Sequence, residues 1–179
     1  MPNVCYLVDG EERRVSDLYV VGQVEGVRAG GSFAWEFTDE RETRIDLAFN
    51  DERAMISTIF VTMDVEHGIA ADPAAEIPAF VEFGLSIPSP VDLEWAQSEL
   101  IDLGRIVVIL EAGSVMWDEP GLYNVLEDGA FFGPVAADDT VTFPMLSPSD
   151  QELLAPSPLT LAELEEPPKE PIPLERDQG

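Results

Sequence analysis

The chain has 179 residues, 45% of them hydrophobic, and carries 36 Asp and Glu against 9 Lys and Arg, a formal net charge of −27. This length suits one domain with a hydrophobic core and is too short for two domains of ordinary size. The negative charge repels phosphate backbones and anionic membrane surfaces, so we expect no direct nucleic-acid backbone binding and no membrane association.

Hydrophobic alternation with a period of two predicts short strands over the first half of the chain. In residues 32–37, Phe33, Trp35 and Phe37 share one face, and these side chains are predicted to enter the core. The pair Gly30-Gly31 predicts a turn before this strand. Strands are expected over residues 4–8, 18–27, 32–37, 44–49, 56–65 and 79–87, with a loop over 68–78.

One helix is predicted over residues 90–103. Ser89 is a suitable N-cap, Pro90 suits the first helical position, and Gly104 is well placed to end the helix. An apolar stripe with the helical period supports this prediction. It consists of Leu93, Ala96, Leu100 and Leu103.

The second half of the chain is again predicted to be β. Residues 105–112 are rich in β-branched side chains and predict a central strand that is buried on both faces. Asp128-Gly129 has the composition of a type I′ hairpin turn between strands 122–126 and 130–135, and a strand over 140–145 closes the domain. The fold class expected is mainly β: an antiparallel β-sandwich or barrel-like sheet with one α-helix (about 90–103) and a disordered C-terminal tail.

The composition changes near Ser147. Residues 147–179 contain seven prolines, eight acidic and two basic residues, and no Phe, Trp or Tyr. A segment without aromatic residues buries too little surface to offset its ordering entropy, so we expect disorder here. The predicted division is therefore an acidic β-sandwich domain over 1–146 and a disordered Pro/Glu-rich acidic tail over 147–179.

Two segments resemble known sandwich proteins. The stretch from Trp117 to Gly129, in which a Pro-Gly turn feeds a strand bearing Tyr123, resembles the penultimate hairpin of Ig-like β-sandwich modules. The segment Leu18–Gly22 is similar to the opening of small, uncharacterised bacterial β-sandwich proteins. Antibody-type domains carry a core disulfide, which a chain whose only cysteine is Cys5 cannot form. The resemblance implies an architecture and no activity.

His67 is the only histidine and lies among carboxylates. Asp64, Glu66, His67 and Asp72 are candidate metal ligands near a strand end, and His67 is a candidate base for a metal-dependent hydrolase. A solvated loop histidine is the alternative. No Gly-x-Ser-x-Gly elbow, P-loop or GxGxxG pattern occurs, so neither catalytic residues nor a cofactor are predicted.

The tail contains a second candidate site. Thr160 and Glu163 form a capping box, and Ser149 with Glu152 repeats it ahead of Leu153-Leu154. Short segments of this kind can fold upon a partner's groove, although a purely solvating tail is the alternative. An exposed Trp on the predicted helix would also mark an interface. The candidate partner-binding residues are Leu153, Leu154, Leu159, Leu161, Leu164 and Trp95.

The leading interpretation is a non-enzymatic protein-binding or accessory domain in the cytoplasm, since the chain opens without a signal peptide and has no apolar run of membrane-spanning length. Other functions stay open: a structural or assembly component of a phage or other particle, a metal-dependent hydrolase using His67, and an acidic DNA mimic. Its partner is predicted to be another protein, and a homo-oligomer is left open. High-salt adaptation and a GC-rich genome explain the acidity equally well.

Overall fold

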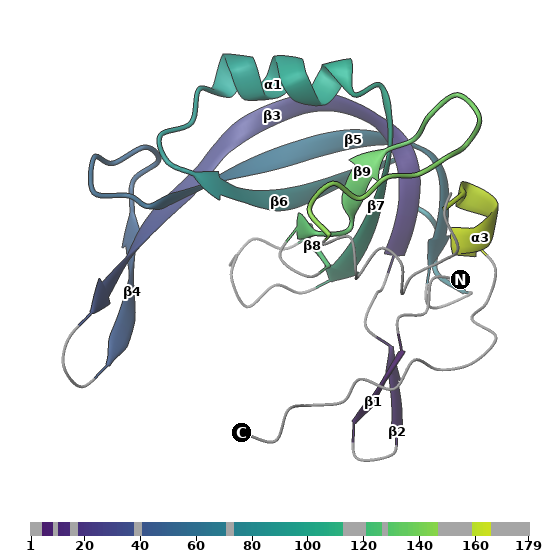
Figure 1. Cartoon of the computed structure of the whole chain (residues 1–179), viewed down its shortest axis with the longest axis horizontal. Helices are drawn as coiled ribbons and strands as arrows, with labels where there is room; N and C mark the ends of the chain where they lie inside the picture. Colours follow the sequence, from purple (N-terminus) through teal and green to yellow (C-terminus); the bar gives the residue numbers. More distant parts are fainter. Residues whose placement is uncertain are drawn as a thin grey trace.

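The computed structural model describes residues 5–8, 11–14, 18–37, 41–70, 74–112, 121–126, 129–146 and 159–165. It is mainly β, as the sequence predicts, with one sheet of seven strands, a separate two-stranded hairpin and few helices (Figure 1). The elements are β1 (Cys5–Val8), β2 (Glu11–Arg14), β3 (Leu18–Phe37), β4 (Glu42–Leu47), β5 (Ile56–Ala70), β6 (Phe80–Pro88), α1 (Leu93–Asp102), β7 (Arg105–Ala112), β8 (Leu122–Val125), β9 (Phe132–Pro134) and α3 (Leu161–Glu165).

The large sheet closes on itself. Its order is β4-β3-β5-β6-β8-β7-β9, and β3 pairs additionally with β7, so β3, β5, β6, β8 and β7 form a ring. All pairs in this ring are antiparallel except β6 with β8, which is parallel. Of the two predicted architectures the structure therefore has the barrel-like one. In chain order α1 lies between β6 and β7, the third and fourth strands of this ring. A five-stranded barrel of this kind resembles the architecture of the OB-fold class.

Strand β3 pairs with three strands, β4, β5 and β7, because it is long enough to have different neighbours along its length. It runs unbroken through Gly30 and Gly31, so the predicted turn at this pair is wrong. Three register shifts interrupt its pairing with β5, and such bulges bend a strand and allow a barrel to close. At the first of them Gly22 lies so close to the carbonyl of Asp64 that a Cβ atom would collide with it.

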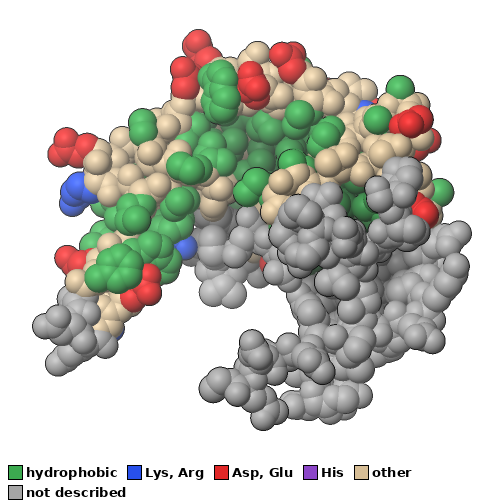
Figure 2. Space-filling view, viewed as in Figure 1, with side chains coloured by type: hydrophobic (Ala, Val, Ile, Leu, Met, Phe, Trp, Pro, Cys, Tyr) green, Lys and Arg blue, Asp and Glu red, His purple; other side chains and the backbone are tan. Residues whose placement is uncertain are grey.

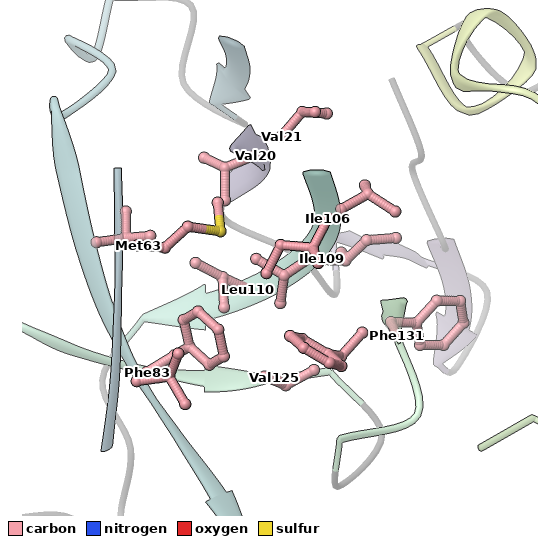
Figure 3. Close-up of a cluster of buried hydrophobic side chains, with 14 of the residues drawn as sticks. Val20, Val21, Met63, Phe83, Ile106, Ile109, Leu110, Val125 and Phe131 are labelled. Carbon is pink, nitrogen blue, oxygen red and sulfur yellow. The ribbon is translucent and has the colours of Figure 1, made fainter. Parts of the chain in front are cut away.

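The core fills the barrel and follows from the apolar patterning. Strand β7 has the predicted bounds, and all five residues from Ile106 to Leu110 are fully buried, as predicted for a central strand. Figure 3 shows side chains from β3, β5, β6, β7 and β8 converging in this core. Labelled examples are Val20, Met63, Phe83, Ile109 and Val125.

Helix α1 packs against β3 and begins later than predicted (Figure 1). The N-cap is Asp92, whose Oδ1 accepts hydrogen bonds from the backbone N–H groups of Glu94 and Trp95 at 3.0 and 3.1 Å. Ser89, the predicted cap, instead donates its backbone N–H to the carbonyl of Met55 at 3.0 Å. The predicted end is confirmed, because Gly104 follows the helix at a φ of 69°.

The last part of the domain differs from the prediction in two ways. Strand β9 pairs with β7 at Ile106–Val108, next to the stretch of the same edge that pairs with β8, and it does not pair with β8, so β8 and β9 are not the predicted hairpin. Residues 140–145 form only isolated bridges, from Val141 to Val135 and from Thr140 to Thr160. The Thr160 bridge draws a segment of the predicted tail to the barrel.

Residues 159–165, which fall within the predicted tail, contain helix α3, which packs against the barrel. Leu161 and Leu164 of α3 are 7% and 8% exposed and belong to the core. The predicted capping box is present, since Glu163 Oε2 accepts the backbone N–H of Thr160 at 2.9 Å and the hydroxyl of Thr160 at 2.9 Å. Core packing therefore extends past residue 146; the rest of the predicted tail lies outside the described residues.

Candidate functional site

Two surfaces bring together side chains that could carry a function. The first, the barrel-end cluster, lies around the first bulge of β3 and β5 and consists of Gln23, Glu66, His67, Arg105 and Asp139. The second, the aromatic arm, consists of Ser32–Phe37 of β3 with β4. In Figure 1 the arm projects to the lower left, away from the barrel.

Glu66 is the bulged residue at the barrel end, since Val21 pairs with His67 while Gly22 pairs with Val65. Its carboxylate accepts hydrogen bonds from Gln23 Nε2 at 3.0 Å and from Arg105 Nε at 2.9 Å. These bonds, the one from Gln23 first, hold the pKa of Glu66 below its usual value. Arg105 also donates to Asp139 Oδ1 at 2.7 Å. The contacts are exposed, so each adds little stability.

His67 lies on the neighbouring position and contacts α3. Its Nε2 is 3.0 Å from Glu165 Oε1, and the hydroxyl of Tyr19 donates to the same oxygen at 3.5 Å. The rings of Tyr19 and His67 meet edge to face with centroids 6.5 Å apart. Burial, and then the negative charge of Glu165, raise the pKa of Tyr19. These contacts join α3 to the barrel.

The predicted metal ligands do not converge within the described residues. No group of three His, Cys, Asp or Glu side chains there is placed to hold a metal ion. Glu66 contacts Gln23 and Arg105, and His67 contacts Glu165. Asp64 pairs with Phe80 across β5 and β6 and is exposed. Asp72 lies outside the described residues, so the complete four-residue site stays a prediction.

The predicted partner-binding residues are separated in the structure. Leu161 and Leu164 are buried in the core, and Leu159 packs against it, so this segment binds the protein's own barrel. Trp95 is 60% exposed on α1, as an interface residue would be. Leu153 and Leu154 lie outside the described residues. External binding by these residues stays a prediction.

The aromatic arm holds large apolar side chains that the barrel does not cover. Trp35, Phe37 and Ile45 are 39%, 69% and 37% exposed, whereas Phe33 is 8% exposed. The rings of Phe33 and Trp35 meet edge to face at 5.9 Å, and the guanidinium of Arg44 lies 4.3 Å from the Phe33 ring centroid. Figure 2 shows hydrophobic side chains gathered over this arm.

Hydroxyl and amide groups hold the base of the arm. Ser57 Oγ lies 2.7 Å from Ser32 Oγ and 3.0 Å from Ser89 Oγ. Asn50, which has a φ of 58°, donates its backbone N–H to Ser32 Oγ at 3.0 Å and exchanges two hydrogen bonds with the backbone of Val91, at 2.7 and 2.8 Å. Because Ser32 and Ser57 are buried, this network fixes the arm relative to the barrel and to the segment before α1.

The exposure of Trp35 and Phe37 corrects the prediction that the aromatic face of residues 32–37 is core. The register places Trp35 opposite Arg44, and Phe37 opposite Glu42. Cross-strand partners share a face, so a row of charges accompanies the row of aromatics. The charged alternation in residues 42–47, read together with a short hairpin loop, is the sequence signal that could have identified this surface.

Comparison of the chain with protein-family models, with curated proteins and with solved structures finds no match. Among the helices in the described part of the chain, none is long and apolar enough to span a membrane.

Proposed function

We propose that this protein is a non-enzymatic protein-binding module whose partner contacts the aromatic arm. The observation that carries the proposal is the exposure of Trp35 and Phe37 on a two-stranded extension outside the barrel. Aromatic side chains supply much of the binding energy at protein interfaces, and apolar patches rimmed by polar groups mark such interfaces. The hydroxyl network at Ser32 and Ser57 supports this role, because an anchored arm loses less entropy on binding.

The charge of the chain favours a protein partner over a nucleic acid. OB-fold barrels include oligonucleotide binders, but a net charge of −27 opposes contact with phosphates. The same charge attracts a partner with a basic surface to the protein and repels acidic proteins. Arg44 stacks on Phe33 and therefore adds planar contact area as well as positive charge.

Site-specific photocross-linking tests the proposal. A photoreactive amino acid at position 37 should cross-link one protein of the native cell extract, which mass spectrometry identifies. The matched control is position 80, because Phe80 is 59% exposed but lies on the barrel. The cross-linked protein should then bind the purified chain, and Trp35→Ala with Phe37→Ala should weaken that binding at least tenfold while Phe80→Ala leaves it unchanged. Equal cross-linking from both positions, or unchanged binding by the double variant, would contradict the proposal.

A further inference from the structure

The outer edge of β4 offers backbone hydrogen-bonding groups in a defined order. Among the described strands β4 has only β3 as a neighbour. The carbonyl of Phe33 accepts the N–H of Met55 at 3.0 Å, so the backbone groups of Phe33 point toward β5. A residue's N–H and C=O point to the same edge of a strand, so Asp46, which pairs with Phe33, directs its own groups away from β3.

This alternation repeats every second residue along β4. Arg44 and Glu42 share the orientation of Asp46 and present their backbone groups at the open edge. Ile45 and Thr43 point theirs toward β3. Any strand added to β4 must therefore form its hydrogen-bonded pairs with Glu42, Arg44 and Asp46. This limits the registers in which a second strand can pair.

The charges along β4 suit a second copy of β4 itself. We infer that two copies of this protein pair antiparallel along β4, in the register centred on Ile45. There Arg44 of each copy lies opposite Asp46 of the other, so both hydrogen-bonded pairs join opposite charges. Each such pair exchanges two backbone bonds, or about four in total. Ile45 meets Ile45 across the twofold axis.

The neighbouring registers are less favourable. Centring the pairing on Arg44 sets this arginine against itself and Glu42 against Asp46. Centring it on Asp46 sets two aspartates together. A register centred on Thr43 joins Glu42 to Arg44 but overlaps only residues 42–44 of the two β4 strands, whereas the Ile45-centred register overlaps residues 43–47. Like charges directly opposite each other destabilise a strand pair, and a shorter overlap forms fewer contacts, so the Ile45-centred register is preferred.

The position of the edge also suits self-association of a chain this acidic. Seven arginines lie in the described residues, and four of them are on the outer half of β3, on β4 or in the loops beside it: Arg28, Arg41, Arg44 and Arg53. These arginines offset part of the acidic charge near the arm and so reduce the repulsion between two copies there. Pairing along the edge leaves the aromatic face open, so the inference does not rest on the proposed function. The two aromatic faces become one continuous surface.

Charge reversal and mixing test the inference by sedimentation velocity. Strand-edge pairing buries little surface and is weak, so the concentration series should reach about 1 mM. Arg44→Asp alone and Asp46→Arg alone should each weaken self-association at least about tenfold, because both cross-copy pairs become like-charged. An equimolar mixture of the two variants should associate as the wild type does. Within one chain Arg44 also contacts Asp46, at 2.8 Å, but mixing the two variants cannot restore this internal contact. Recovered self-association in the mixture therefore reports the contact between copies.

A cysteine scan tests the register independently, in a Cys5→Ser background. Ile45→Cys should form a disulfide-linked dimer under mild oxidation, because facing residues at this kind of position have Cα atoms about 4.5 Å apart. Thr43→Cys should not, unless the Thr43-centred register is correct. Circular dichroism checks that the variants fold. A wild type that stays monomeric, a mixture no more associated than its components, or cross-linking at position 43 in place of position 45 would overturn the inference.

Discussion

At the scale of single residues, the barrel depends on positions where the backbone of one strand approaches another closely. At Gly22 the neighbouring carbonyl of Asp64 occupies the space that a Cβ atom would need. At Gly26 an added Cβ atom would have no other atom within 4 Å. Both glycines are on β3, and β3 passes register shifts near both. The sequence pattern of glycines among apolar residues predicts a bend here, but it cannot tell which glycine is sterically required.

We expect Gly22→Ala to lower the free energy of unfolding by about 2 kcal/mol or more, because the added methyl group must displace backbone. Gly26→Ala is the matched control and should stay within about 1 kcal/mol of the wild type, since alanine restricts the unfolded chain without a collision. Urea denaturation followed by circular dichroism measures both. Similar losses in the two variants would contradict the steric explanation.

At the scale of elements, the sequence predicts a strand correctly where the burial of that strand is decided by its own residues. Strand β7 is buried on both faces, so its continuous apolar run was sufficient to place its ends. The pair Gly30-Gly31 suggested a turn, yet Gly30 serves close packing: a Cβ atom there would lie 2.9 Å from the carbonyl oxygen of Thr58. Such distant contacts are not visible in a local pattern.

The docking of α3 and the exposure of the arm cannot be predicted from the sequence for the same reason. Leucines at the helical period in residues 159–165 do not reveal that the barrel provides a surface for them. Likewise, the aromatic alternation in residues 32–37 does not reveal that the strand has left the barrel by Trp35. Period-two patterns report which side chains share a face, and tertiary packing decides whether that face is covered.

The docking of α3 should contribute measurably to stability. Leu164→Ala removes a side chain that is 8% exposed and leaves a cavity, so we expect the free energy of unfolding to fall by about 2–4 kcal/mol. Ala162→Ser, on the exposed side of the same turn, is the control and should change it by less than about 0.5 kcal/mol. Equal stability of Leu164→Ala and wild type in thermal and urea unfolding would show that α3 is not docked in solution.

The contact of Tyr19 with α3 predicts alkaline sensitivity. Because burial and Glu165 raise the pKa of Tyr19 in the folded protein, the unfolded chain loses this proton first, near pH 10. Folded protein then binds more protons than unfolded protein, so stability should fall as pH rises above about 10. Tyr19→Phe should lose stability less steeply over this range in urea titrations from pH 9 to 11. Tyr123→Phe, measured in parallel, controls for the loss of a tyrosine, and equal slopes for Tyr19→Phe and wild type would refute the assignment.

At the scale of the whole molecule, the aromatic arm is a mixed apolar and charged surface on a strongly acidic chain. Figure 2 shows acidic side chains as separate groups along the edge of the described surface, and the arm combines exposed rings with arginine and carboxylates. A net charge of −27 keeps copies and acidic proteins apart at long range. Association is then favoured only where short-range apolar and hydrogen-bonded contacts outweigh repulsion, as the arm and the β4 edge allow.

The same charge should make stability depend on salt. At 0.01 M salt the Debye length is about 30 Å, so carboxylates repel one another across the whole domain, whereas at 1 M it is about 3 Å and only neighbouring groups interact. We therefore expect the free energy of unfolding at pH 7 to rise between 0.01 and about 1 M NaCl, measured in urea, which leaves ionic strength unchanged. The control is the same series at pH 4, near the pKa of ordinary carboxyl groups, where partial protonation should reduce the salt effect. Stability at pH 7 that is flat or falls with salt would mean that favourable ion pairs such as Arg28–Glu82, 2.7 Å apart, outweigh the excess of carboxylates.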